Sequence, residues 1–460
     1  MPLIAEVFAE FAAALTPGKI PAVVRERAKY LMLDATGIAL ASTKTEFAAS
    51  ALAGLSSWGT GNSVVIGMDS RLSLRDAVTM NGILVHGLDY DDTHTESVMH
   101  VSAGCFPCAL NVAAERGAPG ADMLTSYILG IEVGSRLGIA ANGRFHEVGC
   151  TPSGLLVAFS GALIAGWMHK LNVEELVMAQ GIALSTTSAS SRQYNREGAW
   201  TKRLHPGWCA AGGIVAAALA MNGFVGPREC YEGDYGLYAL HLMGLKEKCD
   251  LSLATAGLGQ IWETNKVAIK PMPACHLAHA CSDAATALAK MHHINGPDVA
   301  SVQAFVPADA VRVICEPVKT RRRPVTSYAA QFSLPYIVAC SLMRGRFGFN
   351  ELERDAYTDP DILSLADKVE YVIDPTFDYP RYFSGGVKVT MRDGREYSHR
   401  ELVNRGSADR PLSAGDIVFK FMENAARAIT KNRAKKIMDA VLSIDECKDV
   451  GKFAEMLSVK

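Results

Sequence analysis

Apolar residues recur at intervals of three and four positions along roughly the first 265 residues of the chain. Each such stretch would place its apolar side chains on one face of an α-helix. The clearest stretches are residues 121–137, 152–169, 173–187 and 208–221. They are rich in alanine and glycine, whose small side chains let helices approach closely. The sequence therefore predicts a helical bundle that is buried on several faces.

The helical period ends near Lys270-Pro271-Met272-Pro273, where two prolines interrupt the backbone. Beyond this point, short segments that are mostly rich in β-branched residues predict strands at 302–306, 369–373, 387–391 and 396–402. The last two flank residues 392–395, whose Gly394 suits the positive φ of a hairpin turn. Helical segments at 275–293, 332–343 and 361–366 accompany the strands. We therefore expect an α+β domain here.

The helical pattern resumes after Ser413, which suits an N-cap and has Asp416 three residues later. The apolar faces of the final segments would rejoin the first bundle. We therefore predict a mainly α fold: a large helical domain built from residues 1–268 and 409–460, and a smaller α+β lid domain inserted at residues 269–408. Clefts between such domains are common ligand sites.

Charge and composition narrow the class of protein. The 46 basic and 48 acidic residues give a formal net charge of −2, which provides no global field for nucleic acid or an anionic membrane. The longest uncharged runs, 47–68 and 206–227, are interrupted by glycine and asparagine, which favours buried core segments over membrane spans. The chain starts without the pattern of a secretion signal, and its 11 scattered cysteines are typical of a reducing compartment. We expect a cytoplasmic protein.

The densest polar cluster is His86–His94, with His100 shortly after it. Such a loop can hold an Asp–His acid/base pair, because the carboxylate orients the imidazole and stabilises its cation. The alternative is a capping loop, in which the Asp and Thr side chains satisfy amides at helix ends. The donors match neither the HExxH nor the EF-hand spacing, so we predict no metal. Cys105 and Cys108 stand in an apolar helical setting, which favours core thiols over a redox pair.

Two lysines stand close to prolines between apolar segments. Lys202 precedes Pro206, and Lys270 precedes Pro271 with His276 beyond it. A lysine in such a break is costly to bury unless it meets an anion, so a substrate carboxylate is a reasonable partner; a solvated hinge lysine is the alternative. The run 321–323 would be either a solvated loop or a carboxylate clamp.

At these clusters the sequence resembles the MmgE/PrpD family, which includes 2-methylcitrate dehydratase, cis-aconitate decarboxylase and iminodisuccinate epimerase. The resemblance covers nearly the whole chain. It rests on five ordered motifs, at residues 86–93, 201–207, 223–233, 270–276 and 332–336. It implies a cofactor-free enzyme of two domains, usually a homodimer, with a helical domain assembled from both chain ends.

The resemblance also implies the residues that carry the chemistry. The expected catalytic residues are Asp89, His100, Lys202 and Lys270. The expected substrate-binding residues are Thr93, Thr151, His276 and Arg323. Thr151 stands where many members have a histidine, and a threonine donates a hydrogen bond but transfers no proton near neutral pH. His146 lies five residues earlier and would reach the cleft only if its loop folds back.

We therefore expect a lyase that acts on a small di- or tricarboxylate, most simply by eliminating water from a 3-hydroxy acid of the methylcitrate type. Removing a proton next to a carboxylate develops a dianion, which Lys202 and Lys270 would stabilise in the transition state. Asp89 and His100 would supply the base and the acid. The alternatives are an epimerase or decarboxylase acting on a related carboxylate, and a non-catalytic carboxylate-binding protein.

Overall fold

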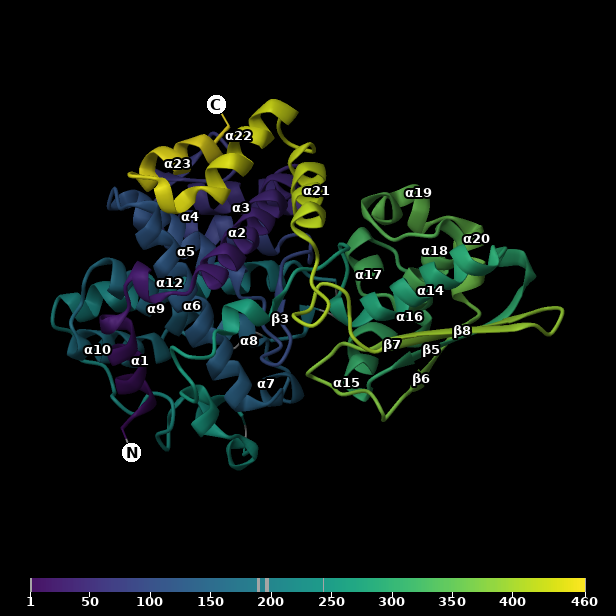
Figure 1. Ribbon diagram of the computed structural model, residues 1–460, viewed down its shortest axis with the longest axis horizontal. Helices are drawn as coiled ribbons and strands as arrows, with labels where there is room; N and C mark the ends of the chain where they lie inside the picture. Colours follow the sequence, from purple (N-terminus) through teal and green to yellow (C-terminus); the bar gives the residue numbers. More distant parts are fainter. Residues whose placement is uncertain (1, 188–190, 195–197, 243, 460) are drawn as a thin grey trace. The chain divides into compact units, whose positions relative to one another are not determined.

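A computed structural model describes all of the chain except residues 1, 188–190, 195–197, 243 and 460 (Figure 1). Helices account for 59% of the residues, which confirms a mainly α fold. The chain divides into two compact units. Unit 1 comprises Met1–Tyr194, Ala199–Ile269 and Ser413–Lys460, so both ends of the chain contribute to it; Lys270–Leu412 forms most of unit 2.

Unit 1 is helical, and its long helices alternate with short ones. Its helices are α1 (Ile4–Ala14), α2 (Ala22–Ser42), α3 (Glu46–Ser56), α4 (Leu74–His86), α5 (Ser102–Glu115), α6 (Gly120–Ala141), α7 (Arg144–Glu147), α8 (Pro152–Leu155), α9 (Val157–Met168), α10 (Val173–Leu184), α12 (Thr201–Met221), α13 (Leu237–His241), α21 (Ala414–Ala425), α22 (Lys431–Leu442) and α23 (Val450–Leu457). Two small antiparallel ladders join β1 (Ser63–Val64) to β2 (Arg71–Leu72) and β3 (Thr93–His94) to β4 (Val267–Ala268).

Helix α12 is central to the core of unit 1, where it packs against α4, α5, α9 and α10. The approach to α4 is close because glycines face one another: a Cβ atom on Gly82 would lie 2.4 Å from the Cα atom of Gly207. Gly82 lies near the C-terminal end of α4, and Gly207 lies near the N-terminal end of α12. The contact therefore brings the last turn of α4, with His86, beside the first turn of α12, with Lys202.

The start of α12 corrects one expectation from the sequence. Prolines near Lys202 predicted a break there, with a helix beginning at Trp208; instead α12 begins at Thr201 and continues through Pro206. A proline inside a helix removes one backbone hydrogen bond. The close packing of the next residue, Gly207, against α4 offsets that loss, so Lys202 lies on a helix rather than in a hinge.

Among the described residues, α12 is also the one helix long and apolar enough to cross a membrane. Its apolar window is 56% buried inside the protein, as is common for a core helix. Of the predicted core segment 206–227, the helical part 206–221 is confirmed, whereas residues 222–225 are exposed. The other predicted core segment, 47–68, is wrong for most of its length, because only residues 47–48 and 64–66 are buried. The side chains of Trp208, Leu219 and Met221 on α12 are exposed.

Other helix boundaries follow from local chemistry. The predicted segment 152–169 is divided at Leu156 into α8 and α9. The cap expected at Ser413 is confirmed, because its Oγ accepts a hydrogen bond from the Asp416 amide at 3.1 Å. That cap begins α21, the helix with which the chain returns to unit 1; α21 packs along α2.

Unit 2 contains a four-stranded sheet in the order β6-β5-β7-β8. The strands are β5 (Val299–Val306), β6 (Val369–Ile373), β7 (Gly385–Met391) and β8 (Glu396–Glu401), with β5 and β6 parallel and the other pairs antiparallel. Its helices are α14 (His279–His292), α15 (Ala308–Ala310), α16 (Val318–Arg322), α17 (Ser327–Gln331), α18 (Leu334–Arg344), α19 (Arg354–Tyr357) and α20 (Pro360–Ala366). Helices α14 and α18 lie over one face of the sheet (Figure 1). The four predicted strands and the hairpin glycine, Gly394 with φ +89°, are confirmed.

Candidate active site

The polar cluster of the sequence forms the connection between α4 and α5. Helix α4 ends at His86, and α5 begins at Ser102. The guanidinium Nε of Arg203, in the first turn of α12, donates a hydrogen bond to the Gly87 carbonyl at 2.7 Å. This bond fastens α12 to the point where the connection leaves α4, so the residues after His86 lie close to Lys202.

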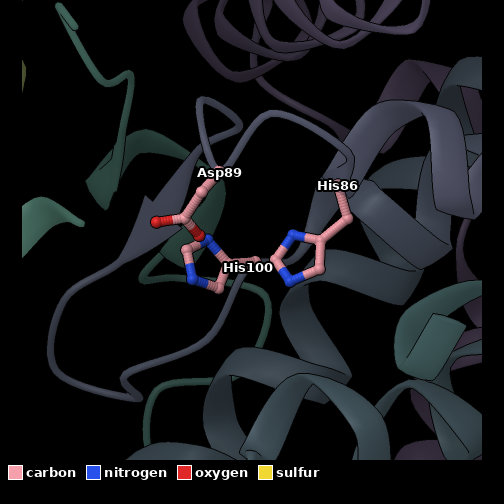
Figure 2. Close-up of side chains that lie close together, drawn as sticks. All are labelled: His86, Asp89 and His100. Atoms are coloured by element: carbon pink, nitrogen blue, oxygen red, sulfur yellow. The ribbon is translucent and has the colours of Figure 1, made fainter. Parts of the chain in front are cut away.

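Two imidazoles of this connection lie side by side around one carboxylate. The His86 Nδ1 atom lies 2.8 Å from Asp91 Oδ2, and both side chains are buried. The His100 Nδ1 atom lies 2.8 Å from the Asp92 carbonyl and 3.7 Å from Asp91 Oδ2. The ring centroids are 4.8 Å apart. Figure 2 shows the side chains of His86, His100 and Asp89 pointing toward one another.

These contacts determine where each neutral imidazole carries its proton. A carboxylate or carbonyl oxygen only accepts, so the Nδ1 atoms of His86 and His100 are the donors. In both rings Nε2 is then the atom that accepts a proton. Asp91 lies behind both rings and stabilises the imidazolium that either would form. The pair is therefore arranged for acid/base work.

Asp89 forms an ion pair with Lys202 in which both side chains are buried. The backbone of Asp89 has φ +49°, in the left-handed region that aspartate tolerates better than most residues. This turn directs the Asp89 carboxylate toward α12, while Asp91 meets the imidazoles. The anion that meets Lys202 in this structure is thus Asp89 itself. A substrate carboxylate that reached Lys202 would share the ammonium with Asp89.

The predicted threonines lie at the edges of the cluster. Thr93 is on β3, opposite Ala268 of β4, and its Oγ1 lies 3.5 Å from His100 Nδ1. Thr151 precedes α8, and its Oγ1 lies 3.4 Å from the Tyr194 hydroxyl. The hydroxyl of Ser153, two residues later, accepts a hydrogen bond from the His100 amide at 2.8 Å. The segment that contains Thr151 therefore holds the backbone of His100.

Asp92 has the capping role that was the alternative for this loop. Its carboxylate accepts hydrogen bonds from the amide and hydroxyl of Ser102 at the start of α5, and the Ser102 hydroxyl also meets Tyr127. The pKa of Asp92 is raised to about 7, mainly by burial; the Asp91 and Asp34 charges add to this rise, and the hydrogen bonds from Ser102 oppose it. The loop thus combines capping by Asp92 with an acid/base arrangement at Asp91.

A buried ion pair between Lys420 and Asp34 contacts the loop at Tyr90. The Lys420 ammonium, on α21, lies 2.7 Å from Asp34 Oδ1 on α2 and donates to the Tyr90 carbonyl at 2.9 Å. It also lies 3.7 Å from the centre of the Tyr90 ring, within the range of a cation–π contact. Burial raises the pKa of Asp34 even though Lys420 opposes that shift. One ammonium thus joins α2, α21 and the loop.

His86, Asp89 and His100 can also be considered as metal ligands, because one possible ligand atom from each lies within 4.8 Å of the others. Two imidazoles and a carboxylate are a common donor set. However, the ammonium of Lys202 already pairs with Asp89. A cation bound here would compete with that ammonium for the carboxylate. The charge balance therefore favours Lys202 as the positive charge of the cluster.

The remaining predicted residues belong to unit 2, beginning with Lys270, which is fully buried and follows β4 by two residues. His276 Nε2 accepts a hydrogen bond from Asn404 Nδ2 at 3.0 Å, and its ring lies 4.8 Å from that of His279. Burial, aided by the charges of His276 and Lys270, holds the pKa of His279 well below its usual value. Lys270, His276 and His279 therefore form a second polar cluster. Arg323 is exposed and ion-paired with Asp367.

Sequence reasoning missed several residues of this arrangement. Asp91 stood in the predicted loop, but nothing in the spacing distinguished its role from that of Asp89. Lys420 lies 330 residues from Tyr90, and only its place on an otherwise amphipathic helix marked it. His205 stood beside Lys202 in the sequence without being assigned a role. Cys105 and Cys108 are core thiols, as predicted. Both are buried in α5, and burial raises the pKa of Cys105 to about 12.

Two protein-family models match almost the whole chain. Residues 6–250 match the MmgE/PrpD N-terminal domain, and residues 272–446 match the MmgE/PrpD C-terminal domain. The chain belongs to the MmgE/PrpD family. The resemblance inferred from the five motifs is thereby confirmed.

Individual relatives of this MmgE/PrpD protein match over nearly their full length. The cis-aconitate decarboxylase-like protein oryM of Aspergillus oryzae is 27% identical, with 96% of this chain and 95% of that protein covered. The cis-aconitate decarboxylase of Aspergillus terreus is 27% identical, covering 97% and 94%. That of Homo sapiens is 27% identical, covering 99% and 94%. These similarities support an enzyme of the lyase type that acts on a tricarboxylate.

Proposed function

We propose that this protein is a lyase that eliminates water from a 3-hydroxy tricarboxylate of the 2-methylcitrate type, using its own side chains without a cofactor. The observation that carries the proposal is the Asp89–Lys202 ion pair beside two imidazoles that share Asp91. This group supplies a cation for a carboxylate together with more than one proton-transfer residue. Elimination of water needs both an acid and a base.

The cation has a clear task in such a reaction. When the C–H bond next to a carboxylate breaks, negative charge develops on that carboxylate, and the Lys202 ammonium would stabilise it. Lys202 lies in the first turn of the 21-residue helix α12, where the helix dipole adds positive potential. A substrate carboxylate beside Lys202 would therefore meet both a full charge and the positive end of a helix.

Proton transfer falls to the imidazole of His100, with Asp91 behind it. In the neutral ring the Nδ1 proton is held by the Asp92 carbonyl, which leaves Nε2 as the atom that exchanges a proton with substrate. As an imidazolium stabilised by Asp91, His100 would protonate the departing hydroxide so that it leaves as water. Thr93, whose hydroxyl lies beside His100, would orient one substrate carboxylate.

Several further contacts are part of the proposal and rest on the family resemblance. We assign to Lys270, together with Lys202, the stabilisation of the developing negative charge, and to His276, Thr151 and Arg323 the role of substrate contacts. Lys270 and His276 are buried in a polar cluster of unit 2, which suits a residue kept for an anion. Arg323 would first have to leave Asp367.

Decarboxylation is the second candidate, because the relatives at 27% identity are named cis-aconitate decarboxylases. The same cation would stabilise the charge left when carbon dioxide departs, and a single acid would then protonate the carbon. The presence of more than one buried imidazole in unit 1 favours elimination, which uses two proton transfers.

We also propose that the protein acts in the cytoplasm as a homodimer. All 11 cysteines are free thiols, as in a reducing compartment. A surface groove of about 1160 Å³ lies between α3, α4 and α12, and Trp58 and Trp208 at its border are largely exposed. An apolar patch that carries both a hollow and protruding rings suits a two-fold contact with a second copy.

Product analysis tests the proposed reaction. Purified protein is incubated in D2O with 2-methylcitrate, citrate, cis-aconitate or iminodisuccinate, and the products are followed by proton NMR and ultraviolet absorbance. We expect 2-methylcitrate to give an alkene, and Lys202→Ala to lower the rate by roughly 100-fold or more. Itaconate and carbon dioxide from cis-aconitate would instead establish decarboxylation. A deuterated isomer without an alkene would indicate epimerisation, and binding without any product would contradict an enzyme.

A further inference from the structure

His205 lies on α12, three residues after Lys202. Residues at this spacing are neighbours on one face of a helix, so the imidazole and the ammonium face the same surroundings. The side chain of His205 is half-buried, and its Nδ1 atom is fully buried. Among the described residues, no hydrogen-bond partner meets that Nδ1 atom. A buried ring nitrogen without a partner is unusual enough to require an explanation.

The groups around His205 connect it to the proposed site. Its ring meets the ring of Tyr194 edge-on at a centroid distance of 6.0 Å, and the Tyr194 hydroxyl lies 3.4 Å from Thr151 Oγ1. Among residues with described positions, the titratable groups recorded against His205 are Lys202 on its own helix, His86 from α4 and Tyr194. His86 also has a buried ring nitrogen, Nε2, without a partner among the described residues. Within the described part of the chain, His205 and His86 thus each have a buried ring nitrogen without a partner, and the charges of His86 and Lys202 both act on His205.

The protonation state of His205 suits a group that accepts a proton. Burial, with smaller contributions from the charges of His86 and Lys202, lowers the pKa of His205 to about 4. The ring is therefore neutral near neutral pH and has a lone pair available. A polycarboxylate bound at Lys202 would add negative charge near the ring and raise this pKa toward the range in which an imidazole is an effective base.

We propose that His205 is the second proton-transfer group of the site and removes the proton from the substrate carbon next to the carboxylate held by Lys202. The electron pair of the broken C–H bond becomes the second bond of the alkene. The C–O bond breaks, and the hydroxide leaves as water with a proton from the His100 imidazolium. His205 ends as the imidazolium and His100 as the neutral ring. This inference rests on the proposed elimination reaction.

His146 provides a matched control for His205. It is another imidazole within the electrostatic reach of Lys202, and burial, with Arg192 and Lys202, holds its pKa well below the usual value. However, it lies on the short helix α7, and its carbonyl accepts a hydrogen bond from Arg192 at 3.0 Å. We assign it no part in the reaction. A general effect of removing an imidazole near Lys202 would appear equally in both variants.

The first test compares the full-length variants His205→Gln and His146→Gln with 2-methylcitrate. We expect His205→Gln to lower kcat by roughly 100-fold with KM changed less than about threefold, and His146→Gln to leave both within about threefold. The acidic limb of the kcat/KM profile should also move in the His205 variant. An unchanged kcat in His205→Gln, or an equal loss in both variants, would overturn the proposal.

The second test does not depend on turnover. Imidazole nitrogens of the ¹⁵N-histidine-labelled protein are titrated by NMR with and without saturating citrate, and His205 is assigned from the spectrum of its Gln variant. We expect citrate to raise the pKa of His205 by about one unit or more. If the wild-type protein converts none of the acids, the proposed function fails and the role of His205 as its base fails with it. If the protein does convert one of them, an unchanged His205 pKa in the citrate-saturated protein would overturn this inference alone.

Discussion

Replacing Lys420 by methionine isolates the ion pair that supports the loop. The change removes an ammonium that lies 2.7 Å from Asp34 and 2.9 Å from the Tyr90 carbonyl, while a side chain of similar length remains. Both charged side chains are almost fully buried, at 5% and 1% exposure. Removing one partner of such a pair costs about 3–5 kcal/mol, because the other charge stays buried without compensation.

Protonation of Asp34 limits that cost. Burial already raises the pKa of Asp34 in the presence of Lys420, and the loss of the lysine raises it further. A carboxyl whose pKa is higher in the folded state than in the unfolded state costs stability as pH rises above the unfolded pKa, about 3.9. We therefore expect a loss of about 3 kcal/mol near pH 7 that becomes smaller toward pH 4.

Tryptophan fluorescence during urea unfolding measures the free energy of unfolding of unit 1, to which the ion pair belongs. The five tryptophans, Trp58, Trp167, Trp200, Trp208 and Trp262, all belong to unit 1. The double variant Lys420→Met with Asp34→Asn is the control, and it should recover at least half of the lost free energy of unfolding because no charge is left buried. A loss below about 1 kcal/mol, or a double variant no more stable than the single one, would refute the reasoning.

Two further predictions concern the carboxylates of Asp91 and Glu263, each of which contacts a histidine of the segment 86–100. Asp91→Asn should lower kcat by roughly 100-fold or more with little change in the unfolding midpoint, because His86 and His100 lose the charge that stabilises their cations. Steady-state kinetics with the substrate found by product analysis measures this effect. A kcat within threefold of wild type would contradict it. Burial alone would raise the pKa of Glu263, but the hydrogen bond from His94 and the charges of His94 and Lys266 bring it down to about 2. A pKa lowered in the folded state gives stability that is lost as pH falls through about 4.5 toward 2, so Glu263→Gln should be less stable than wild type by about 2–3 kcal/mol at pH 6 and nearly equal near pH 2. Urea unfolding at both pH values measures the difference, and a gap that does not depend on pH would exclude this explanation.

The elements that periodicity determines could be predicted from the sequence. Helices α6 and α10 follow the apolar period of the sequence, and strand β6 matches its run of mostly β-branched residues. The start of α12 could not be predicted, because Pro206 is a local signal for a break. A tertiary contact overrides it: Gly207 packs against α4 in a way that no local pattern records.

The candidate site shows the same division. The short segment that holds His86, Asp89 and His100 was recognisable because polar residues stand together between apolar helices. The assignment of each carboxylate was not, since the positive φ of Asp89 turns its side chain to α12 and leaves Asp91 with the imidazoles. Arg323 is exposed and already paired with Asp367, a contact across 44 residues that sequence spacing does not indicate.

The return of α21 to unit 1 has a consequence for how the protein is made. Tyr90 is synthesised 330 residues before Lys420, whose ammonium donates a hydrogen bond to the Tyr90 carbonyl. All of unit 2 is synthesised in between. A nascent chain that lacks its last helices would leave Asp34 without the Lys420 ammonium, so the Tyr90 loop acquires this support only when translation is nearly finished.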